Sequence, residues 1–192
     1  MKPQDILLLL KLVSLQHASG LAPAALAVRE APPVTDDAWS VRTLGDATGI
    51  SKSEVSAALR RCQYAGLVAP DRETGRPKAN TQALYELLAH GIRYVFPVKP
   101  GPVVRGVPTA HSAPVLLGRL LSGGNQVFVW ADAEGEAVGE RIEPLFRSVP
   151  DAARGDRHLY DMLALVDSIR LGRAREVELA RKLLKEYLAG GE

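Results

Sequence analysis

The chain has 192 residues, of which 46% are hydrophobic, and a formal net charge of +2. This length and hydrophobic content are sufficient to bury a core in one or two small domains, which excludes a disordered tail. The small net charge excludes a general polyanion binder, so binding to DNA would need a local basic patch, used in two copies.

The single cysteine, Cys62, excludes an internal disulfide and favours the reducing cytoplasm. Near the N-terminus, the apolar run 6–10 is short, is followed by Lys11 and has no basic leader before it. It therefore predicts neither a signal peptide nor a membrane span, and we expect a cytoplasmic protein with no membrane partner. We interpret the run as the first helix, with one packing face formed by Ile6, Leu9, Leu10 and Val13.

Residues 18–37 are rich in alanine and proline and predict a loop inserted after this helix. Residues 26–30 suit one or two helical turns before Pro32 and Pro33 stop them. The loop is longer than the usual connection between helices, and the sequence leaves two roles open for it. Either the loop packs against a partner subunit, or its sequence can vary without a functional consequence.

Residues 40–68 have the layout of two helices joined by a tight turn and followed by a strand. In the first helix, Leu44 and Ala47 lie three residues apart on one face. Gly49 permits the turn, and Ile50 is the apolar residue that closes it. The pattern predicts a helix-turn-helix.

The second of these helices has two faces of different character. It begins at a capping box, in which Ser51 accepts the backbone N–H of Glu54 and the Glu54 carboxylate reaches back to Ser51. One face is a buried stripe formed by Val55, Ala58, Leu59 and Cys62. The opposite face holds small polar residues and two cations but no acid, namely Lys52, Ser53, Ser56, Ala57, Arg60 and Gln63.

Such a polar face suits double-stranded DNA, because the major groove admits an α-helix and arginine binds guanine there in a bidentate way. We expect Arg60 to read a base, and Lys52 and Arg61 to contact phosphates. The alternative is that Arg60 and Arg61 belong to an ordinary solvated helix face. On the buried stripe, we interpret Cys62 as a small inert hydrophobe, against the alternative of a redox sensor.

A hairpin is predicted after the second helix. Residues 67–69 form a short apolar strand, residues 70–75 are rich in turn formers, and residues 76–78 make the return. Between residues 39 and 80 there are seven cations and four acids, a net charge of +3. The hairpin cations Arg72, Arg76 and Lys78 suit the DNA backbone or minor groove, although Asp71 and Glu73 dilute their charge.

The segment from Pro3 to Gly91 resembles the winged helix-turn-helix of bacterial transcription regulators of the MarR-like kind. The resemblance is carried by G-I-S-x-S-x-V-S-x-A-L-R-R followed by A-G-L-V, between Gly49 and Val68. It implies a three-helix bundle with a β-wing, presented twice by a homodimer. It also implies base-facing residues Ser53, Ser56, Ala57 and Arg60, and wing residues Arg72, Arg76 and Lys78. Gly45, where the family more often has alanine, departs from the pattern and should loosen the first helix by roughly 0.5–1 kcal/mol.

The second half of the chain has a different composition. Residues 81–90 predict a helix that ends at Gly91. Residues 92–114 contain five prolines, which forbid long helices and favour extended segments and turns. Residues 126–131 predict a buried strand, residues 132–135 a turn, and residues 137–142 a returning partner strand. We therefore expect a boundary between a domain of residues 1–91 and a domain of residues 92–192.

Two helices are predicted to close the chain, at 157–171 and 173–188, on either side of Gly172. Their apolar stripes are Leu159, Met162, Leu163, Val166 and Ile169 in the first and Val177, Ala180, Leu183, Leu184 and Tyr187 in the second. The stripes build a dimer or pack on the chain's own second domain. The polar side is a salt-bridge cluster, a partner surface or a solvated face, and it comprises Asp167, Arg170, Arg173, Arg175 and Glu176.

No motif predicts an enzyme. Neither of two candidate sets has the spacing of a catalytic or metal-binding motif. The first set is His111 and Ser112 with Asp132, and the second is His90 and His158 with nearby acids. We expect no catalytic activity, no metal and no cofactor. The small-residue stretch 105–114 lines an effector pocket or, as the alternative, is a structural loop that crosses the core.

Together these patterns predict an α+β protein, with an N-terminal winged-helix domain, a small β-containing domain and a C-terminal helical hairpin. We expect a homodimeric regulator that binds double-stranded DNA, acting as a repressor at an inverted-repeat operator. The alternative is a protein-interaction module, because the second half loosely resembles bacterial antitoxin-type regulators of nucleotidyltransferase-type toxins and suits a protein partner. The expected DNA-binding residues are Arg42, Lys52, Ser53, Ser56, Ala57, Arg60, Arg61, Gln63, Arg72, Arg76 and Lys78.

Overall fold

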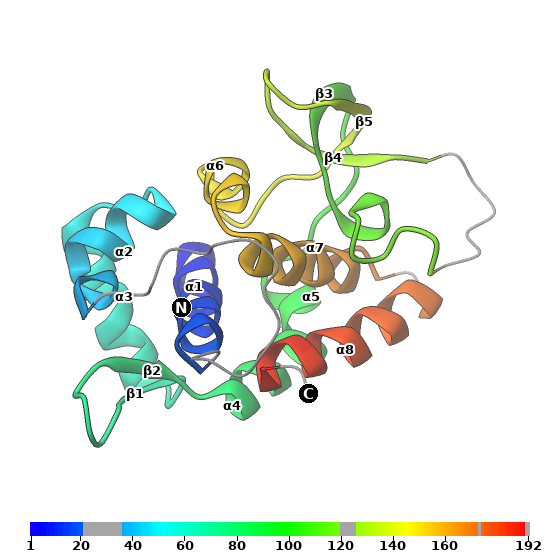
Figure 1. Ribbon diagram of the computed structural model, residues 1–192. Helices are drawn as coiled ribbons and strands as arrows, with labels where there is room; N and C mark the ends of the chain where they lie inside the picture. The colour runs from blue at the N-terminus through cyan, green and yellow to red at the C-terminus, as the bar shows by residue number, and fades with distance from the viewer. Residues whose placement is uncertain (21–35, 120–125, 173, 191–192) are drawn as a thin grey trace, which may run out of the picture.

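The computed structural model describes residues 1–20, 36–119, 126–172 and 174–190 as a mixed α+β structure (Figure 1). The expected helical turns at 26–30 lie outside the described residues. The helices, in chain order, are α1 (Pro3–Gly20), the short η1 (Asp36–Trp39), α2 (Val41–Thr48), α3 (Lys52–Tyr64), α4 (Thr81–Glu86), the π-helical η2 (Leu87–Gly91), α5 (Ile92–Val95), η3 (Ala110–Ser112), α6 (Val149–Arg154), α7 (Arg157–Leu171) and α8 (Ala174–Ala189). The strands are β1 (Val68–Pro70), β2 (Pro77–Ala79), β3 (Val103–Pro108), β4 (Phe128–Ala131) and β5 (Ala137–Arg141).

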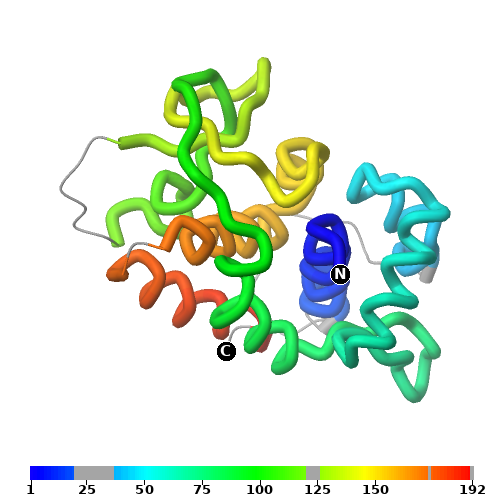
Figure 2. Tube along the Cα trace, turned by 180° about the vertical axis from the view of Figure 1, so that it is seen from behind, coloured from blue at the N-terminus to red at the C-terminus, as the bar shows by residue number. Residues whose placement is uncertain are grey.

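Helix α1 lies in the middle of the molecule and not along one side of it. It runs between α2 and α3 on one side and α7 on the other (Figures 1 and 2). The side chains from Ile6 to Leu10 are all fully buried, so the expected single packing face is wrong. A helix that is apolar all round is stable in water only when neighbours cover every face, and these three helices together with β2 supply that cover.

The helix that begins at Thr81 does not end at Gly91. It passes from α4 through the wider turn of η2 into α5, and Gly91 has φ −105°, outside the left-handed region that a glycine C-cap uses. The reason is Ile92, which is 1% exposed and packs in the core when the helix continues. The expected domain boundary between residues 91 and 92 therefore falls inside a helix, and one core cluster includes residues from Ile6 to Leu188.

Strands β3, β4 and β5 close a small barrel. β3 is antiparallel to both β4 and β5, so β4 and β5 are parallel to each other and are not the expected hairpin. Two glycines allow this tight closure. A Cβ on Gly106 would lie 1.9 Å from the Trp130 carbonyl oxygen, and a Cβ on Gly139 would lie 2.4 Å from that of Val127.

The two C-terminal helices agree closely with the sequence prediction. Asp156 caps α7 by accepting the backbone N–H of Leu159 at 3.0 Å, and Gly172 ends it with φ 78°. Burial extends beyond the expected stripe, since every residue of α7 from Leu159 to Arg170 is buried. α8 packs against α7 and α4, so the stripes of both helices contribute to the chain's own core.

Of the polar residues expected on one side of these helices, Arg175 is exposed, whereas Asp167 and Arg170 are buried and form an ion pair, as the salt-bridge alternative predicted. Asp167 is 1% exposed and accepts hydrogen bonds from Thr109 Oγ1 at 2.9 Å, Trp130 Nε1 at 2.6 Å and Arg170 Nη1 at 2.6 Å. Glu176 is also buried. A buried ion pair is tolerated when its remaining donors and acceptors are satisfied, and this network joins the barrel to α7. Arg173 lies outside the described residues.

Candidate nucleic-acid interface

Helices α2 and α3 meet at a turn that is set by two glycines. Gly49 ends α2 in the left-handed conformation with φ 66°. A Cβ on Gly45 would lie 2.8 Å from the carbonyl oxygen of Ile50, so glycine lets the turn pack directly on α2. Only the flexibility that Gly45 gives to α2 was expected from the sequence. The structure shows a second role, because glycine at this position lets the backbone of Ile50 come close to α2. Ser40 caps the other end of α2, accepting the Thr43 N–H at 3.1 Å.

The capping box expected at the start of α3 does not form. Ser51 occupies the N-cap position without a side-chain capping bond. The Glu54 carboxylate instead accepts hydrogen bonds from Lys2 Nζ and Arg61 Nη2, both at 2.8 Å. These bonds lower the pKa of Glu54. In this arrangement the Glu54 carboxylate binds two charged donors, whereas the capping box would offer it one uncharged backbone N–H, which explains the preference.

Arg61 fastens α3 to α1. Its guanidinium donates to both carboxylate oxygens of Asp5, at 3.0 Å from Nε and 2.7 Å from Nη2. Asp5 is fully buried, so its charge requires such a partner. Arg61 therefore has a structural role, and its expected contact with DNA phosphate stays a prediction. Sequence reasoning missed Asp5, whose place in the first turn of an apolar helix could have drawn attention to it.

The opposite face of α3 is open to solvent. Lys52, Ser53, Arg60 and Gln63 are exposed, while Ser56 and Ala57 are half-buried. Within the described part of the chain, neither Lys52 nor Arg60 makes an ion pair, and Arg42 on α2 is likewise exposed. Tyr64, at the end of α3, is 97% exposed and was absent from the expected set. The residues expected on the polar face are thus exposed or half-buried, and none of them is buried in the core.

The hairpin of β1 and β2 is confirmed, with Val68 opposite Ala79 in an antiparallel register. Asp71 organises its turn by accepting the backbone N–H of Thr74 at 3.0 Å and that of Glu73 at 3.1 Å. Hydrogen bonds from Thr74 lower the pKa of Asp71.

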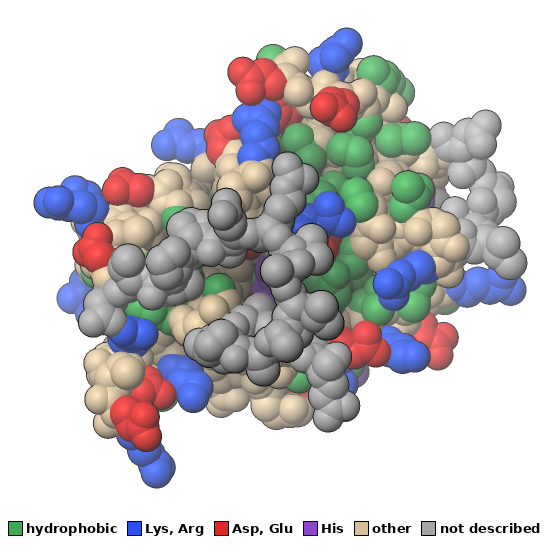
Figure 3. Space-filling view, in the orientation of Figure 1, with side chains coloured by type: hydrophobic (Ala, Val, Ile, Leu, Met, Phe, Trp, Pro, Cys, Tyr) green, Lys and Arg blue, Asp and Glu red, His purple; other side chains and the backbone are tan. Residues whose placement is uncertain are grey.

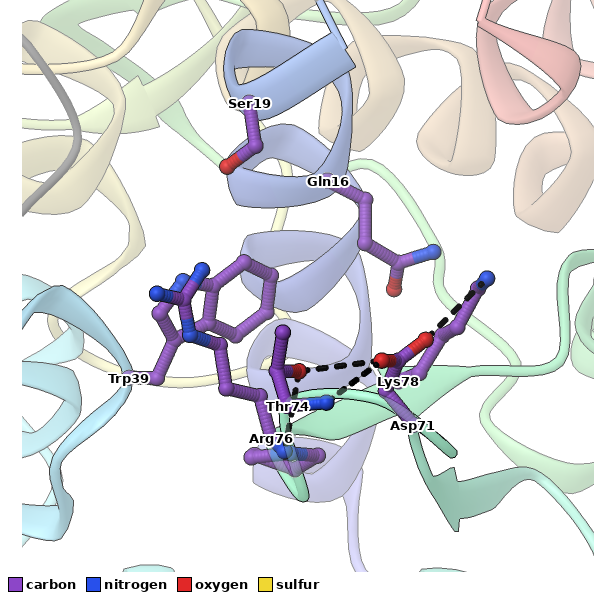
Figure 4. Close-up of a pocket in the computed structure, with 8 residues that line it drawn as sticks. Gln16, Ser19, Trp39, Asp71, Thr74, Arg76 and Lys78 are labelled. Carbon is purple, nitrogen blue, oxygen red and sulfur yellow. Dashed lines mark hydrogen bonds and ion pairs between the residues drawn. The ribbon is translucent and has the colours of Figure 1, made fainter. Parts of the chain in front are cut away.

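The hairpin cations differ in their surroundings. Lys78 lies 3.6 Å from the Asp71 carboxylate, although its side chain is 60% exposed. Arg76 turns back over the ring of Trp39, with its guanidinium carbon 6.0 Å from the ring centroid (Figure 4). Both therefore have partners within the chain. Arg72 is exposed and has no such partner among the residues that the structure describes.

A cavity of about 260 Å³ is lined by residues of this hairpin and of the C-terminal end of α1. Its lining includes Trp39 and Arg76 on one side and Gln16 on the other (Figure 4). The Gln16 side-chain oxygen accepts the Ala79 N–H at 2.7 Å, which ties β2 to α1. The hairpin is therefore held against α1, the same helix to which Arg61 fastens α3.

Charge is distributed unevenly over α2, α3 and the hairpin. In the view of Figure 3, Lys and Arg side chains stand along the left edge, over these elements, with acidic side chains between them. Two of the four acids in this segment, Glu54 and Asp71, bind cations of the chain itself. The remaining basic side chains on α2 and α3 point away from the core.

The second half of the chain touches the turn between α2 and α3. Ser148, just before α6, donates a hydrogen bond from its hydroxyl to the carbonyl oxygen of Thr48. A Cβ on Gly49 would lie 2.6 Å from the Cβ of Ser148. Glycine is therefore needed at position 49 for its conformation and also for this contact, a role that sequence reasoning missed.

The residues considered for catalysis make structural contacts. His111 Nε2 lies 2.8 Å from the carbonyl oxygen of Gln126, and Ser112 Oγ accepts the Phe128 N–H at 2.9 Å. His158 stacks on His17 with ring centroids 4.4 Å apart. Among the described residues, no group of three or more His, Cys, Asp or Glu side chains is arranged to hold a metal ion. Burial of Thr109, Ala110 and His111 agrees with the structural alternative for the stretch 105–114.

In the described part of the chain, none of the helices combines the length and the apolar character that crossing a membrane requires. Comparison of the chain with models of known protein families gave no match. Comparisons with curated proteins and with solved structures likewise gave no match.

Proposed function

We propose that the protein is a sequence-specific DNA-binding transcription regulator, in which α2, α3 and the β1–β2 hairpin act as a winged helix-turn-helix. One observation carries the proposal. The outer face of α3 is polar, basic and exposed, while its inner face is anchored to α1 through buried apolar residues and the Arg61–Asp5 ion pair. A rigid helix with a free polar face is what insertion into a major groove requires.

The residues of this surface have different proposed roles. Arg60 reads a guanine in a bidentate way, and Ser53, Ser56, Ala57 and Gln63 line the groove beside it. Lys52, Arg42 and Arg72 contact phosphates. Arg61, Arg76 and Lys78 are weaker candidates because each has a partner in the chain.

The regulator acts as a homodimer that represses transcription from an inverted repeat. A net charge of +2 leaves one copy with little electrostatic attraction for DNA, so two copies of the basic face favour binding. With two-fold symmetry, the half-sites lie about 10–10.5 base pairs apart, or a multiple of that, because both helices then face the same side of the duplex.

A fluorescence-anisotropy titration tests this function. Duplex DNA from the region upstream of the protein's own gene is compared with a scrambled duplex, at two salt concentrations, for the wild type and for Arg60→Ala. The matched control is Lys182→Ala, which removes an exposed cation from α8. We expect tighter binding to the native duplex that Arg60→Ala abolishes and Lys182→Ala preserves. Equal weak binding of both duplexes that disappears with salt would overturn the proposal.

A second candidate function is protein interaction, as in an antitoxin-type partner of another protein. The observation that favours it is a pair of exposed valines on the barrel, Val103 and Val138, which are 66% and 59% exposed. Hydrophobic side chains gather over this part of the molecule in Figure 3. Exposed apolar patches of this kind commonly mark protein interaction sites. This candidate becomes the better one if the titration finds only unspecific, salt-sensitive binding.

A further inference from the structure

Tyr64 is the most exposed large hydrophobic residue in the described part of the chain, at 97%. Within that part, its ring makes no aromatic or cation contact and its hydroxyl makes no hydrogen bond. Tyrosine buries a large apolar ring when it serves a fold, and here it buries almost none. The fold therefore gives no reason for a tyrosine at this position.

Helical geometry places Tyr64 within the free face of α3. It follows Arg60 by four residues and Ala57 by seven, spacings that put side chains on the same side of a helix. The buried residues Val55 and Cys62 lie on the other side. Tyr64 therefore extends the proposed DNA-binding surface by one turn toward the C-terminal end of α3.

The position along α3 decides what Tyr64 can reach. In a helix-turn-helix, the N-terminal residues of the second helix contact base edges, so its C-terminal end lies nearer to the sugar-phosphate backbone. The tyrosine hydroxyl is a neutral donor, and tyrosine is among the side chains that bind phosphate oxygens in protein–DNA complexes. A full turn of α3 separates this hydroxyl from the base-reading Arg60.

We propose that Tyr64 is a phosphate-binding residue, which donates a hydrogen bond from its hydroxyl to the DNA backbone and fixes the depth of α3 in the groove. This inference rests on the proposed function. A neutral donor releases no counterion, because the phosphate keeps its charge. Tyr64 thus differs from Lys52, whose contact with a phosphate contributes about 0.9 to the slope of log K against log salt.

The test is a titration of DNA binding by Tyr64→Phe, which removes only the hydroxyl. The native and scrambled duplexes are titrated over a series of salt concentrations. We expect binding about tenfold weaker for both duplexes, since hydrogen bonds to charged groups are stronger than neutral ones, with the salt slope unchanged. Lys52→Ala is expected to reduce the slope as well as the affinity.

The matched control is Tyr94→Phe, which removes the hydroxyl of another exposed tyrosine, 75% exposed on α5. It should bind as the wild type does. Wild-type affinity of Tyr64→Phe would overturn the inference, as would a loss confined to the native duplex, which indicates base reading. If Arg60-dependent binding persists in either case, only this inference fails. If the wild type shows no Arg60-dependent preference, the proposed function fails as well.

Discussion

Substitution of Gly49 by alanine tests how the turn between α2 and α3 is held. Two separate costs arise at this position. The left-handed conformation, φ 66°, costs an alanine about 1–2 kcal/mol. The new Cβ would also lie 2.6 Å from Ser148 Cβ and 2.8 Å from Ser148 Oγ, and overpacking of this kind adds about 1–3 kcal/mol. We expect Gly49→Ala to lower the free energy of unfolding by about 2–5 kcal/mol, the sum of the two costs.

Gly66→Ala is the matched control for the conformational cost. Gly66 has nearly the same φ, 72°, but a Cβ there would meet nothing within 4 Å. We expect Gly66→Ala to cost only about 1–2 kcal/mol. The free energies are measured by urea unfolding, followed by circular dichroism at a fixed protein concentration.

Ser148→Gly isolates the second cost, because it removes the Cβ that the new methyl group would strike. In a double-mutant cycle, the cost of Gly49→Ala should fall in the Ser148→Gly background to that of Gly66→Ala. If Gly49→Ala and Gly66→Ala destabilise equally, and the Ser148→Gly background changes nothing, then the segment before α6 does not pack on the turn. The reasoning would then be refuted.

Three further predictions concern buried ionisable groups. Arg61→Ala leaves the Asp5 carboxylate buried without its partner and should lower the free energy of unfolding by about 3 kcal/mol. The control Arg60→Ala should change the free energy of unfolding by less than about 0.5 kcal/mol. Equal effects of the two substitutions in urea unfolding would contradict this prediction. Burial, together with the neighbouring ring of His17, lowers the pKa of His158 below its ordinary value of 6.5. The folded state then binds fewer protons than the unfolded state, so stability should fall as the pH drops below 6.5; a urea midpoint that is as high at about pH 5 as at about pH 7.5 would refute this. Burial raises the pKa of the Cys62 thiol to about 12. A thiol reagent at about pH 8 should therefore label Cys62 only after the protein is unfolded in urea. Complete labelling of the protein in native buffer would contradict this prediction.

Local sequence signals determined much of the secondary structure. The bounds of α7 follow from an Asp156 cap, an apolar stripe and Gly172, and all three signals lie within or beside the helix. The turn at Gly49 and the β1–β2 hairpin are likewise set by neighbouring residues. The exposed face of α3 was predictable for the same reason, because helical periodicity alone separates it from the buried stripe. Tyr64 belongs to that periodicity and was overlooked.

Tertiary structure decided the partners of charged and polar groups. Glu54 binds Lys2, and Arg61 binds Asp5, each across more than fifty residues of sequence. No local pattern encodes such pairs, because which charges meet depends on how α1 packs against α3. The buried carboxylate of Asp167 is a further example, because its partners Thr109 and Trp130 come from segments that are distant in the sequence.

The topology of the second half could also not be predicted from local sequence patterns. The parallel pairing of β4 and β5 follows from β3 standing antiparallel to both, a relation among three separate segments. The helix continues through Gly91 because Ile92 finds a place in the core. Propensities and turn signals thus predicted many of the helices and strands, because these depend largely on interactions within about one turn, but they did not predict the helix that continues through Gly91. Packing between distant segments alone decided which charged residues remain free to meet a ligand.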